Sequence, residues 1–234
     1  MGIIKLDKSI IPACDVDTIE DYKKLVSATH HVEGIGGYKI GFSLALTYGL
    51  PMLVEETRKF TDLPLIYDHQ KAATDIPDTG DSFAKVCKRA GVDAIILFPQ
   101  SGPATEEAWI KAAQKEKLGV IVGGEMTHPK YKKSEGGYIS DEALNDIYIN
   151  AAKNNVTNFV VPGNKPDRIK HYRDLLTSNS VEPVFYAPGF VAQGGEISDA
   201  AKAAGDKWHA IVGRGIYAAK DMTAAAKEMT SKLR

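Results

Sequence analysis

Five ionisable residues of both signs stand at or just after short apolar runs in the first third of the chain. They are Asp15, Lys39, Asp68, Lys71 and Asp75. If these runs are neighbouring strands of a parallel barrel, their carboxyl ends meet at one face, and the five charges converge there. Ammonium and carboxylate groups that converge keep one another ionised, and they can stabilise developing charge and transfer a proton. The pattern therefore predicts an active site built on paired charges.

Lys39 is the member of this set that is hardest to explain by structure alone. It lies inside the run 37–41, where a central strand should be apolar. An inward lysine there costs free energy unless carboxylates pair with it. Asp15 has a second explanation, because Asp17 and Thr18 follow it and an aspartate at a strand end can cap the next helix.

Glycine-rich turns follow two successive apolar runs in the last third of the chain. They lie at 188–189 with 193–195, and at 213–215. Glycines let backbone N–H groups approach an anion, and a guanidinium holds phosphate oxygens with two hydrogen bonds. Loops after the seventh and eighth strands are the usual phosphate site of a (β/α)₈ barrel. We predict a phosphate site, with Arg214 as the cation that clamps the phosphate, at Pro188, Gln193, Gly194, Gly213 and Arg214.

The elements that would position these residues alternate along the chain. Short β-branched runs alternate with longer stretches of helical periodicity, which is typical of a parallel sheet with crossover helices. We expect strands at 10–15, 37–41, 63–68, 94–98, 119–124, 158–161, 183–187 and 210–213. Outer helices are expected at 19–29, 83–90, 106–117, 142–153 and 222–233. The length of 234 residues fits a single-domain α/β protein, a (β/α)₈ TIM barrel over 1–234.

One long stretch, 127–140, has no clear periodicity and contains three lysines and two glycines. It follows the fifth expected strand, so it would lie on the C-terminal face where barrel enzymes keep their active sites. Its composition suits a mobile loop, and we predict that it forms a lid. The alternative is an ordinary solvated loop.

The composition excludes several classes of protein. The net charge is −1, so no basic excess is available to hold a nucleic-acid polymer. No uncharged apolar run approaches the roughly 20 residues of a membrane span, and the first residues lack the apolar core of a signal peptide. We expect a cytoplasmic protein without a membrane or nucleic-acid partner. Cys14 and Cys87 are expected to be buried free thiols, with no second pair to build a metal site.

With these motifs in view, the chain resembles the orotidine 5'-monophosphate decarboxylase family over nearly its whole length. The similar segments are Lys39-Ile40-Gly41, Asp75-Ile76-Pro77-Asp78-Thr79, Met126-Thr127-His128-Pro129, Gln193-Gly194-Gly195 and Val212-Gly213-Arg214. The resemblance implies an enzyme without cofactor or metal. It would convert orotidine 5'-monophosphate (OMP) to UMP and CO2, the last step of de novo UMP synthesis.

The resemblance also implies residue roles. Lys39, Asp68, Lys71 and Asp75 would form an alternating Lys-Asp-Lys-Asp array in which Lys71 protonates C6 of the pyrimidine. Asp15 would bind the ribose and Thr127 the pyrimidine edge, while the phosphate would be held by Pro188, Gln193, Gly194, Gly213 and Arg214. The protein would be a homodimer in which Asp75 and Thr79 reach into the neighbouring subunit's site.

The spacing of the array departs from the family pattern. That pattern is usually Asp-x-Lys-x-x-Asp. Here the interval from Asp68 to Lys71 and the interval from Lys71 to Asp75 are each one residue longer. Residues three apart on a strand face opposite sides, so Asp68 and Lys71 converge only if the strand bulges or ends at Asp68. We predict that break. His69 is expected to pack or to form a hydrogen bond near the site, and Gln70 inside the barrel with Lys71 in bulk solvent would contradict the proton-donor role.

Two other functions stay open. A Mg2+-dependent sugar-phosphate synthase or decarboxylase on the same scaffold would share the phosphate loops. Such relatives carry a metal-binding glutamate where this chain has Lys39, and a cation there would repel Mg2+. A non-catalytic nucleotide-phosphate-binding protein would bind UMP without turnover, as the shifted spacing suggests, but unused buried charges would be costly.

Overall fold

The computed structural model describes residues 2–70, 72–190 and 196–233. In this part of the chain eight parallel strands close into a barrel, in which each strand pairs with the next and β8 returns to β1. The strands are β1 (Lys8–Cys14), β2 (Tyr38–Ile40), β3 (Leu65–Asp68), β4 (Ala94–Leu97), β5 (Gly119–Gly123), β6 (Asn158–Val160), β7 (Val184–Pro188) and β8 (Trp208–Val212). The predicted (β/α)₈ TIM barrel is confirmed, and all eight expected strands overlap the observed ones.

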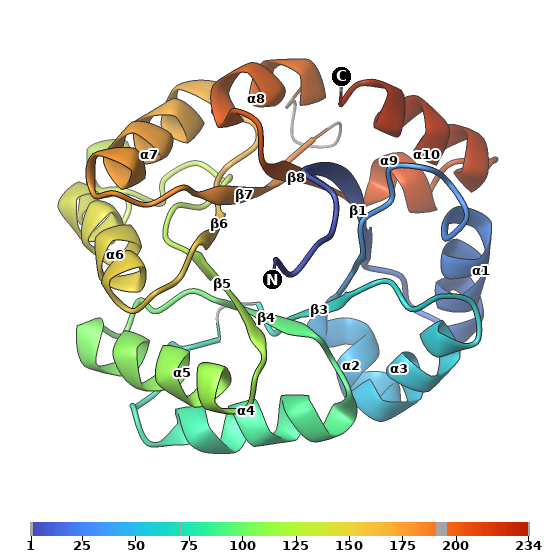
Figure 1. Cartoon of the computed structure of the whole chain (residues 1–234), viewed down its shortest axis with the longest axis horizontal. Coiled ribbons are helices and arrows are strands. Elements are labelled where there is room, and N and C mark those ends of the chain that lie inside the picture. Colours follow the sequence, from blue (N-terminus) through green and yellow to red (C-terminus); the bar gives the residue numbers. More distant parts are fainter. Residues whose placement is uncertain (1, 71, 191–195, 234) are drawn as a thin grey trace.

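Helices follow the strands and form an outer ring around them (Figure 1). They are α1 (Ile19–Thr29), α2 (Phe42–Tyr48), α3 (Leu50–Arg58), α4 (Thr79–Ala90), α5 (Pro103–Lys115), α6 (Asp141–Lys153), α7 (Pro166–Ser178), α8 (Ile197–Ala204), α9 (Arg214–Tyr217) and α10 (Met222–Ser231). The five helices named from periodicity are confirmed as α1, α4, α5, α6 and α10. Four outer helices, α2, α3, α7 and α8, were not specified from the sequence.

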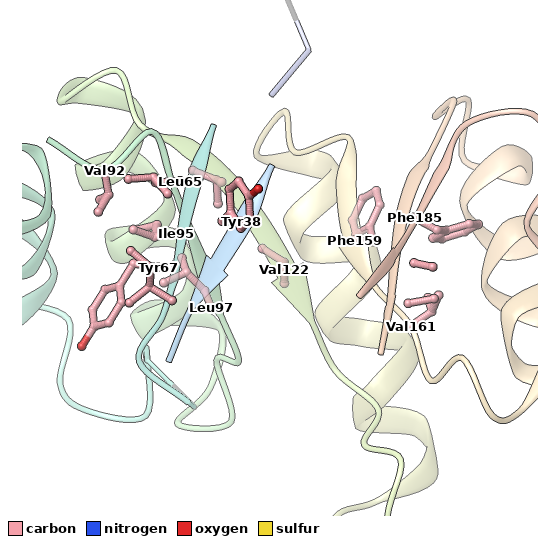
Figure 2. Packing of buried hydrophobic residues seen from close by; sticks show 14 of the residues in the cluster. Tyr38, Leu65, Tyr67, Val92, Ile95, Leu97, Val122, Phe159, Val161 and Phe185 are labelled. Atoms are coloured by element: carbon pink, nitrogen blue, oxygen red, sulfur yellow. The ribbon is translucent and has the colours of Figure 1, made fainter. Parts of the chain in front are cut away.

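Alternate strand residues point to opposite sides of the barrel wall, because a strand has a period of two. Outward residues such as Leu65 and Ile95 pack with the helices in one buried cluster (Figure 2). Inward residues such as Ile66 and Ile96 form a second cluster inside the barrel. Lys39 lies between two outward neighbours on β2, and the same alternation therefore turns its side chain into the barrel.

Residues before β1 close the N-terminal end of the barrel. Figure 1 shows the start of the chain inside the ring of strands. Ile4 is buried in the interior cluster, and Ile3 packs against that cluster. Glycine is required where they pass: a Cβ on Gly119 would lie 2.6 Å from Ile3 Cγ1. The C-terminal face of the barrel is the end left for a functional site.

The two cysteines and the lengths of the helices in the described residues can be compared with what the composition predicted. Cys14 and Cys87 are both free and buried, as predicted. Burial raises the pKa of Cys87 to about 12, so this thiol stays protonated and unreactive at neutral pH. No helix in the described part of the chain is long and apolar enough to cross a membrane.

Candidate active site

A cavity of about 280 Å³ opens at the C-terminal ends of the strands. Its charged and polar lining includes Asp15, Lys39, Asp68, Gln70, Glu125, Thr127 and Arg214. Its apolar wall includes Ile96, Phe98, Met126, Val160, Phe190 and Ile211. An apolar cavity with a few convergent polar groups is the usual form of a small-molecule site, and this one lies on the face where barrels carry their chemistry.

Lys39 stands between two carboxylates at the floor of this cavity. Its Nζ lies 3.2 Å from Asp68 Oδ2 and 3.5 Å from Asp15 Oδ1. Burial disfavours the charged ammonium, but the neighbouring Asp68 and Asp15 carboxylates outweigh it and hold the pKa of Lys39 above its ordinary value. Lys39 is therefore a cation at neutral pH. The structure brings together three of the five predicted charges.

Asp15 reaches this position by continuing the inward side of β1. It is one residue beyond the strand and two beyond the inward Ala13. Gly41 leaves room for it, since a Cβ there would lie 2.7 Å from Asp15 Oδ1. Thr18, not Asp15, caps α1: its hydroxyl accepts a hydrogen bond from Asp21 N at 3.1 Å. The helix-cap explanation of Asp15 is therefore wrong.

β3 ends at Asp68, which confirms the predicted break. Gln70 N donates to Asp68 Oδ1 at 2.9 Å, and both Gln70 (φ 54°) and Ala73 (φ 68°) have left-handed backbone conformations. Such conformations are rare for residues other than glycine and turn the chain sharply out of the strand. Gln70 lines the cavity. Lys71 lies outside the described residues, so its place in the site stays a prediction.

His69 and the Asp75 loop lie on the outer side of this turn. The His69 ring is hydrogen-bonded to the Tyr67 hydroxyl at 2.5 Å and packs edge-on against Phe83, as expected for a structural residue near the site. Asp75 is exposed, and its carboxylate accepts a hydrogen bond from Ile76 N at 2.8 Å. Neither Asp75 nor Thr79 is among the residues that line the cavity of the same chain.

The Asp75 loop is fixed from α5. Thr105 Oγ1 donates to Asp75 O at 2.9 Å, and Trp109 Nε1 donates to Ile76 O at 3.1 Å. Both donors are buried, whereas the Ile76 side chain is 58% exposed. The main chain of the loop is therefore held in place while the Asp75 and Ile76 side chains are exposed.

The predicted phosphate residues lie at the ends of the last two strands. Pro188 ends β7, and Gly213 and Arg214 lead from β8 into the short helix α9. All three line the cavity. Gln193 and Gly194 lie outside the described residues. Tyr217 also lines the cavity, and sequence reasoning missed it although it stands three residues after Arg214, on the same face of α9.

The 127–140 segment is more regular than its sequence suggested. Lys132 and Ile139 form an isolated β-bridge, and a turn of 3-10 helix spans Lys133–Glu135. Thr127 lines the cavity, but the rest of the segment does not. Residues 138–140 instead line a separate cavity of about 470 Å³ beside α5 and α6.

Glu125 is the functional candidate that sequence reasoning missed. It lines the cavity and has no exposed side-chain surface. The signal was present in the alternation, because Ile121 faces the interior and residues 123 and 125 follow it at the strand period. Tyr172 and Arg168 both hydrogen-bond to its carboxylate at 2.6 Å.

The comparisons with known proteins agree with this geometry. The sequence model of the Orotidine 5'-phosphate decarboxylase / HUMPS family matches residues 8–229. The chain is 31% identical over 224 residues to orotidine 5'-phosphate decarboxylase of Methanosarcina mazei, covering 96% of this chain and 94% of the relative. It is 34% identical over 221 residues to the enzyme of that name from Pyrococcus furiosus, covering 94% and 95%.

A solved structure extends the similarity to three dimensions. Orotidine 5'-monophosphate decarboxylase from Methanocaldococcus jannaschii, complexed with the inhibitor BMP, aligns with a TM-score of 0.84 at 26% identity, over 97% of this chain and 99% of that one. The family match spans most of the sequence, and the relatives align along nearly their whole length. This chain therefore belongs to the Orotidine 5'-phosphate decarboxylase / HUMPS family.

Proposed function

We propose that this protein decarboxylates OMP to UMP and CO2 in pyrimidine nucleotide synthesis, acting as a single barrel domain over residues 1–234. The observation that carries the proposal is the cluster of Lys39 with Asp15 and Asp68 on the C-terminal face, beside the phosphate loops. Relatives with the name orotidine 5'-phosphate decarboxylase align over nearly the whole chain. The charges and the alignment together favour this reaction over others of the fold.

The cavity has a suitable group for each part of the nucleotide. Arg214 and Gly213 line it at the start of α9 and would bind the phosphate together with Pro188, Gln193 and Gly194. Asp15, which is partly exposed at the cavity, would accept hydrogen bonds from the ribose hydroxyls. Thr127 would contact the pyrimidine edge, and the apolar wall would cover the faces of the ring.

The chemistry requires stabilisation of a carbanion. Loss of CO2 from C6 leaves an electron pair in an orbital that the pyrimidine ring delocalises poorly. Lys71 would lie against C6, where its ammonium favours the developing charge and then donates the proton that replaces CO2. Asp68 and Asp75 would keep Lys71 protonated, as Asp68 and Asp15 do for Lys39. Each charged group in the array would thus keep its neighbours ionised.

Asp68 would also act on the departing group. It is held by Lys39 and by the backbone N–H of Gln70, and these contacts would keep it in place beside the substrate carboxylate. Two like charges about 4 Å apart repel by about 4 kcal/mol at an effective dielectric constant of about 20. This repulsion disappears as CO2 leaves, so it lowers the barrier rather than only weakening binding.

A homodimer would complete the site. Asp75 and Thr79 do not line the cavity of their own chain, and the main chain at Asp75 is anchored, which suits residues that reach into a neighbouring subunit. Exposed apolar side chains accompany them: Ile76 is 58% exposed, and Leu46 of α2 is 73% exposed. Helix α2 follows β2, and the Asp75 loop follows the adjacent strand β3. Large exposed apolar side chains are typical of a contact surface.

The position of Lys39 argues against Mg2+-dependent sugar-phosphate chemistry. Its ammonium lies within 3.5 Å of both Asp15 and Asp68, in the space that a divalent cation would need in order to use these carboxylates. A Mg2+ ion there would face a buried positive charge. The decarboxylase is therefore favoured over this alternative on the same scaffold.

Product analysis tests the proposal. Purified protein is incubated with OMP, and nucleotides are separated by anion-exchange chromatography while CO2 is trapped. We expect equimolar UMP and CO2, released over many turnovers. UMP binding without turnover would identify a binding protein instead. Turnover of ketose phosphates that depends on added Mg2+ would identify a sugar-phosphate synthase or decarboxylase.

A further inference from the structure

Glu125 is the most completely buried charged residue among the described residues that line the cavity. It follows β5 and directly precedes Met126 and Thr127. None of its side-chain surface is exposed. The proposed mechanism gives it no role, yet a buried carboxylate costs free energy unless its partners compensate fully. Its partners therefore indicate what it does.

Four groups satisfy the Glu125 carboxylate. Tyr172 Oη and Arg168 Nε each donate to Oε2 at 2.6 Å. Oε1 faces two ammonium groups, Lys165 Nζ at 3.3 Å and Lys132 Nζ at 3.6 Å. Burial disfavours the anion, but these hydrogen bonds and cations outweigh it and hold the pKa of Glu125 below its ordinary value. The Glu125 carboxylate thus connects α7 to Lys132 of the 127–140 segment and to Lys165 of the turn before α7.

The turn before α7 also holds the main chain around Thr127. Lys165 Nζ donates to Met126 O at 3.2 Å, and Asn164 Nδ2 donates to Thr127 O at 3.3 Å. Glu125 makes the shortest ion pair of Lys165, so it fixes the cation that fixes this backbone. An apolar side chain of similar volume would fill the same space without the cost of burying charge, so stability alone does not explain the ionic arrangement.

We infer that Glu125 is a positioning residue for recognition of the base, acting through Lys165 on Thr127. The inference rests on the proposed function, because Thr127 is assigned there to the pyrimidine edge. The inference assigns recognition of the base and binding of the phosphate to different residues. Base recognition depends on Glu125, whereas phosphate binding by Arg214, which follows β8, does not.

The test compares a ligand that has the base with one that lacks it. Glu125→Gln keeps the shape of the side chain but removes the charge that three cations need. We expect it to weaken UMP binding about ten-fold, a coupling of the size seen within one interaction network. Ribose 5-phosphate, measured as a competitor of UMP, should bind within about two-fold of wild type. Lys165→Met, which leaves Arg168 and Lys132 beside Glu125, should show the same selective loss.

A double-mutant cycle identifies the route of the effect. Thr127→Val removes the hydroxyl at constant shape, and Glu125→Gln should add little to the UMP loss of that variant if it acts through Thr127. Glu106→Gln is the matched control, since Glu106 is equally buried but lies on α5 away from this cavity. It should bind UMP as wild type does.

Two outcomes separate this inference from the proposed function. If the wild-type protein neither binds UMP nor consumes OMP, the proposed function fails and the inference fails with it. If the wild type does both, the inference alone is overturned when folded Glu125→Gln and Lys165→Met bind UMP like wild type. Equal weakening of UMP and ribose 5-phosphate would overturn it as well.

Discussion

Lys39 is the residue on which the charge cluster depends. Without its ammonium, Asp15 and Asp68 would lie at the cavity without the cation that now pairs with both of them. Removing one member of a buried ion pair typically costs about 3 to 5 kcal/mol of stability. Lys39→Met should therefore destabilise the fold and lower kcat/KM for OMP by about 10³-fold or more. Urea unfolding and initial rates measure the two effects.

Lys23→Met is the control for that prediction. Lys23 is exposed and pairs with Glu56, which Lys59 also contacts at 2.6 Å, so the loss of Lys23 should leave unfolding and turnover close to wild type. A Lys39→Met protein that kept the wild-type kcat/KM would show that the cluster is not part of the chemistry.

Glu106 gives the protein a pH-dependent stability unrelated to catalysis. Burial, with a smaller contribution from Glu107, raises the pKa of Glu106 to about 7, although Asn150 donates a hydrogen bond to it. The folded state therefore keeps a proton that the unfolded chain releases near pH 4.5. The stabilisation is complete below that pH and is lost as the pH rises through about 7, by roughly 3 kcal/mol.

Glu106→Gln should remove this dependence. The variant cannot ionise, so its free energy of unfolding relative to wild type should increase between pH 5 and pH 8, as measured by urea unfolding of both proteins at each pH. His209 does not disturb the comparison, because burial lowers its pKa to about 4 in either protein. A constant difference across this range would show that Glu106 ionises normally in the fold.

At the scale of elements, the strands and the inward residues follow from alternation, and five of the ten described α-helices follow from amphipathic periodicity. Asp15, Lys39 and Asp68 meet because each lies at an inward position near a strand end. α2 was not specified because its apolar residues do not share one face: Leu44 is buried, whereas Phe42 and Leu46 are exposed. In the proposed dimer such residues would belong to the contact surface, which the periodicity of a single chain does not reveal.

The sequence was less informative where the local pattern of residue types does not determine the path of the chain. Glu125 was missed because the apolar run was taken to end at 124, so the inward series was not followed one step further. The break after Asp68 was predictable from spacing alone. The left-handed conformations at Gln70 and Ala73 were not, because neither residue type favours them.

α5 is the element that positions the Asp75 loop. Thr105→Val would remove the hydroxyl that donates to Asp75 O while keeping the shape of the side chain. Loss of one hydrogen bond should cost about 1 kcal/mol of stability. Activity should fall further, by about ten-fold in kcat, because in the proposed dimer a displaced Asp75 would no longer reach the neighbouring subunit's site.

Thr230→Val makes the same change in α10, where the Thr230 hydroxyl donates to Lys227 O at 3.1 Å far from this loop. It should leave kcat unchanged. Thermal unfolding and steady-state kinetics of the two variants give the comparison. A Thr105→Val enzyme with the kcat of the Thr230→Val control would show that α5 does not position Asp75 for catalysis.

At the scale of the whole molecule, the proposed site is shared between two subunits. Lys39→Met and Asp75→Asn should each abolish turnover, but in a two-fold symmetric dimer the two defects fall in the same site of a heterodimer and leave the other site intact. Co-expressed in equal amounts, the variants should recover about a quarter of wild-type activity, because half of the dimers are mixed. Turnover no greater than that of the separate variants would place Asp75 in the site of its own chain, or outside catalysis altogether.

The most direct test of the central claim follows the loss of OMP absorbance with the wild-type protein and with Lys71→Ala. We expect rapid turnover by the wild type, a fall of several orders of magnitude in Lys71→Ala, and retained UMP binding in that variant. A Lys71→Ala protein that turned OMP over at the wild-type rate would contradict the Lys-Asp-Lys-Asp array. A wild-type protein that left OMP unchanged would contradict the decarboxylase itself.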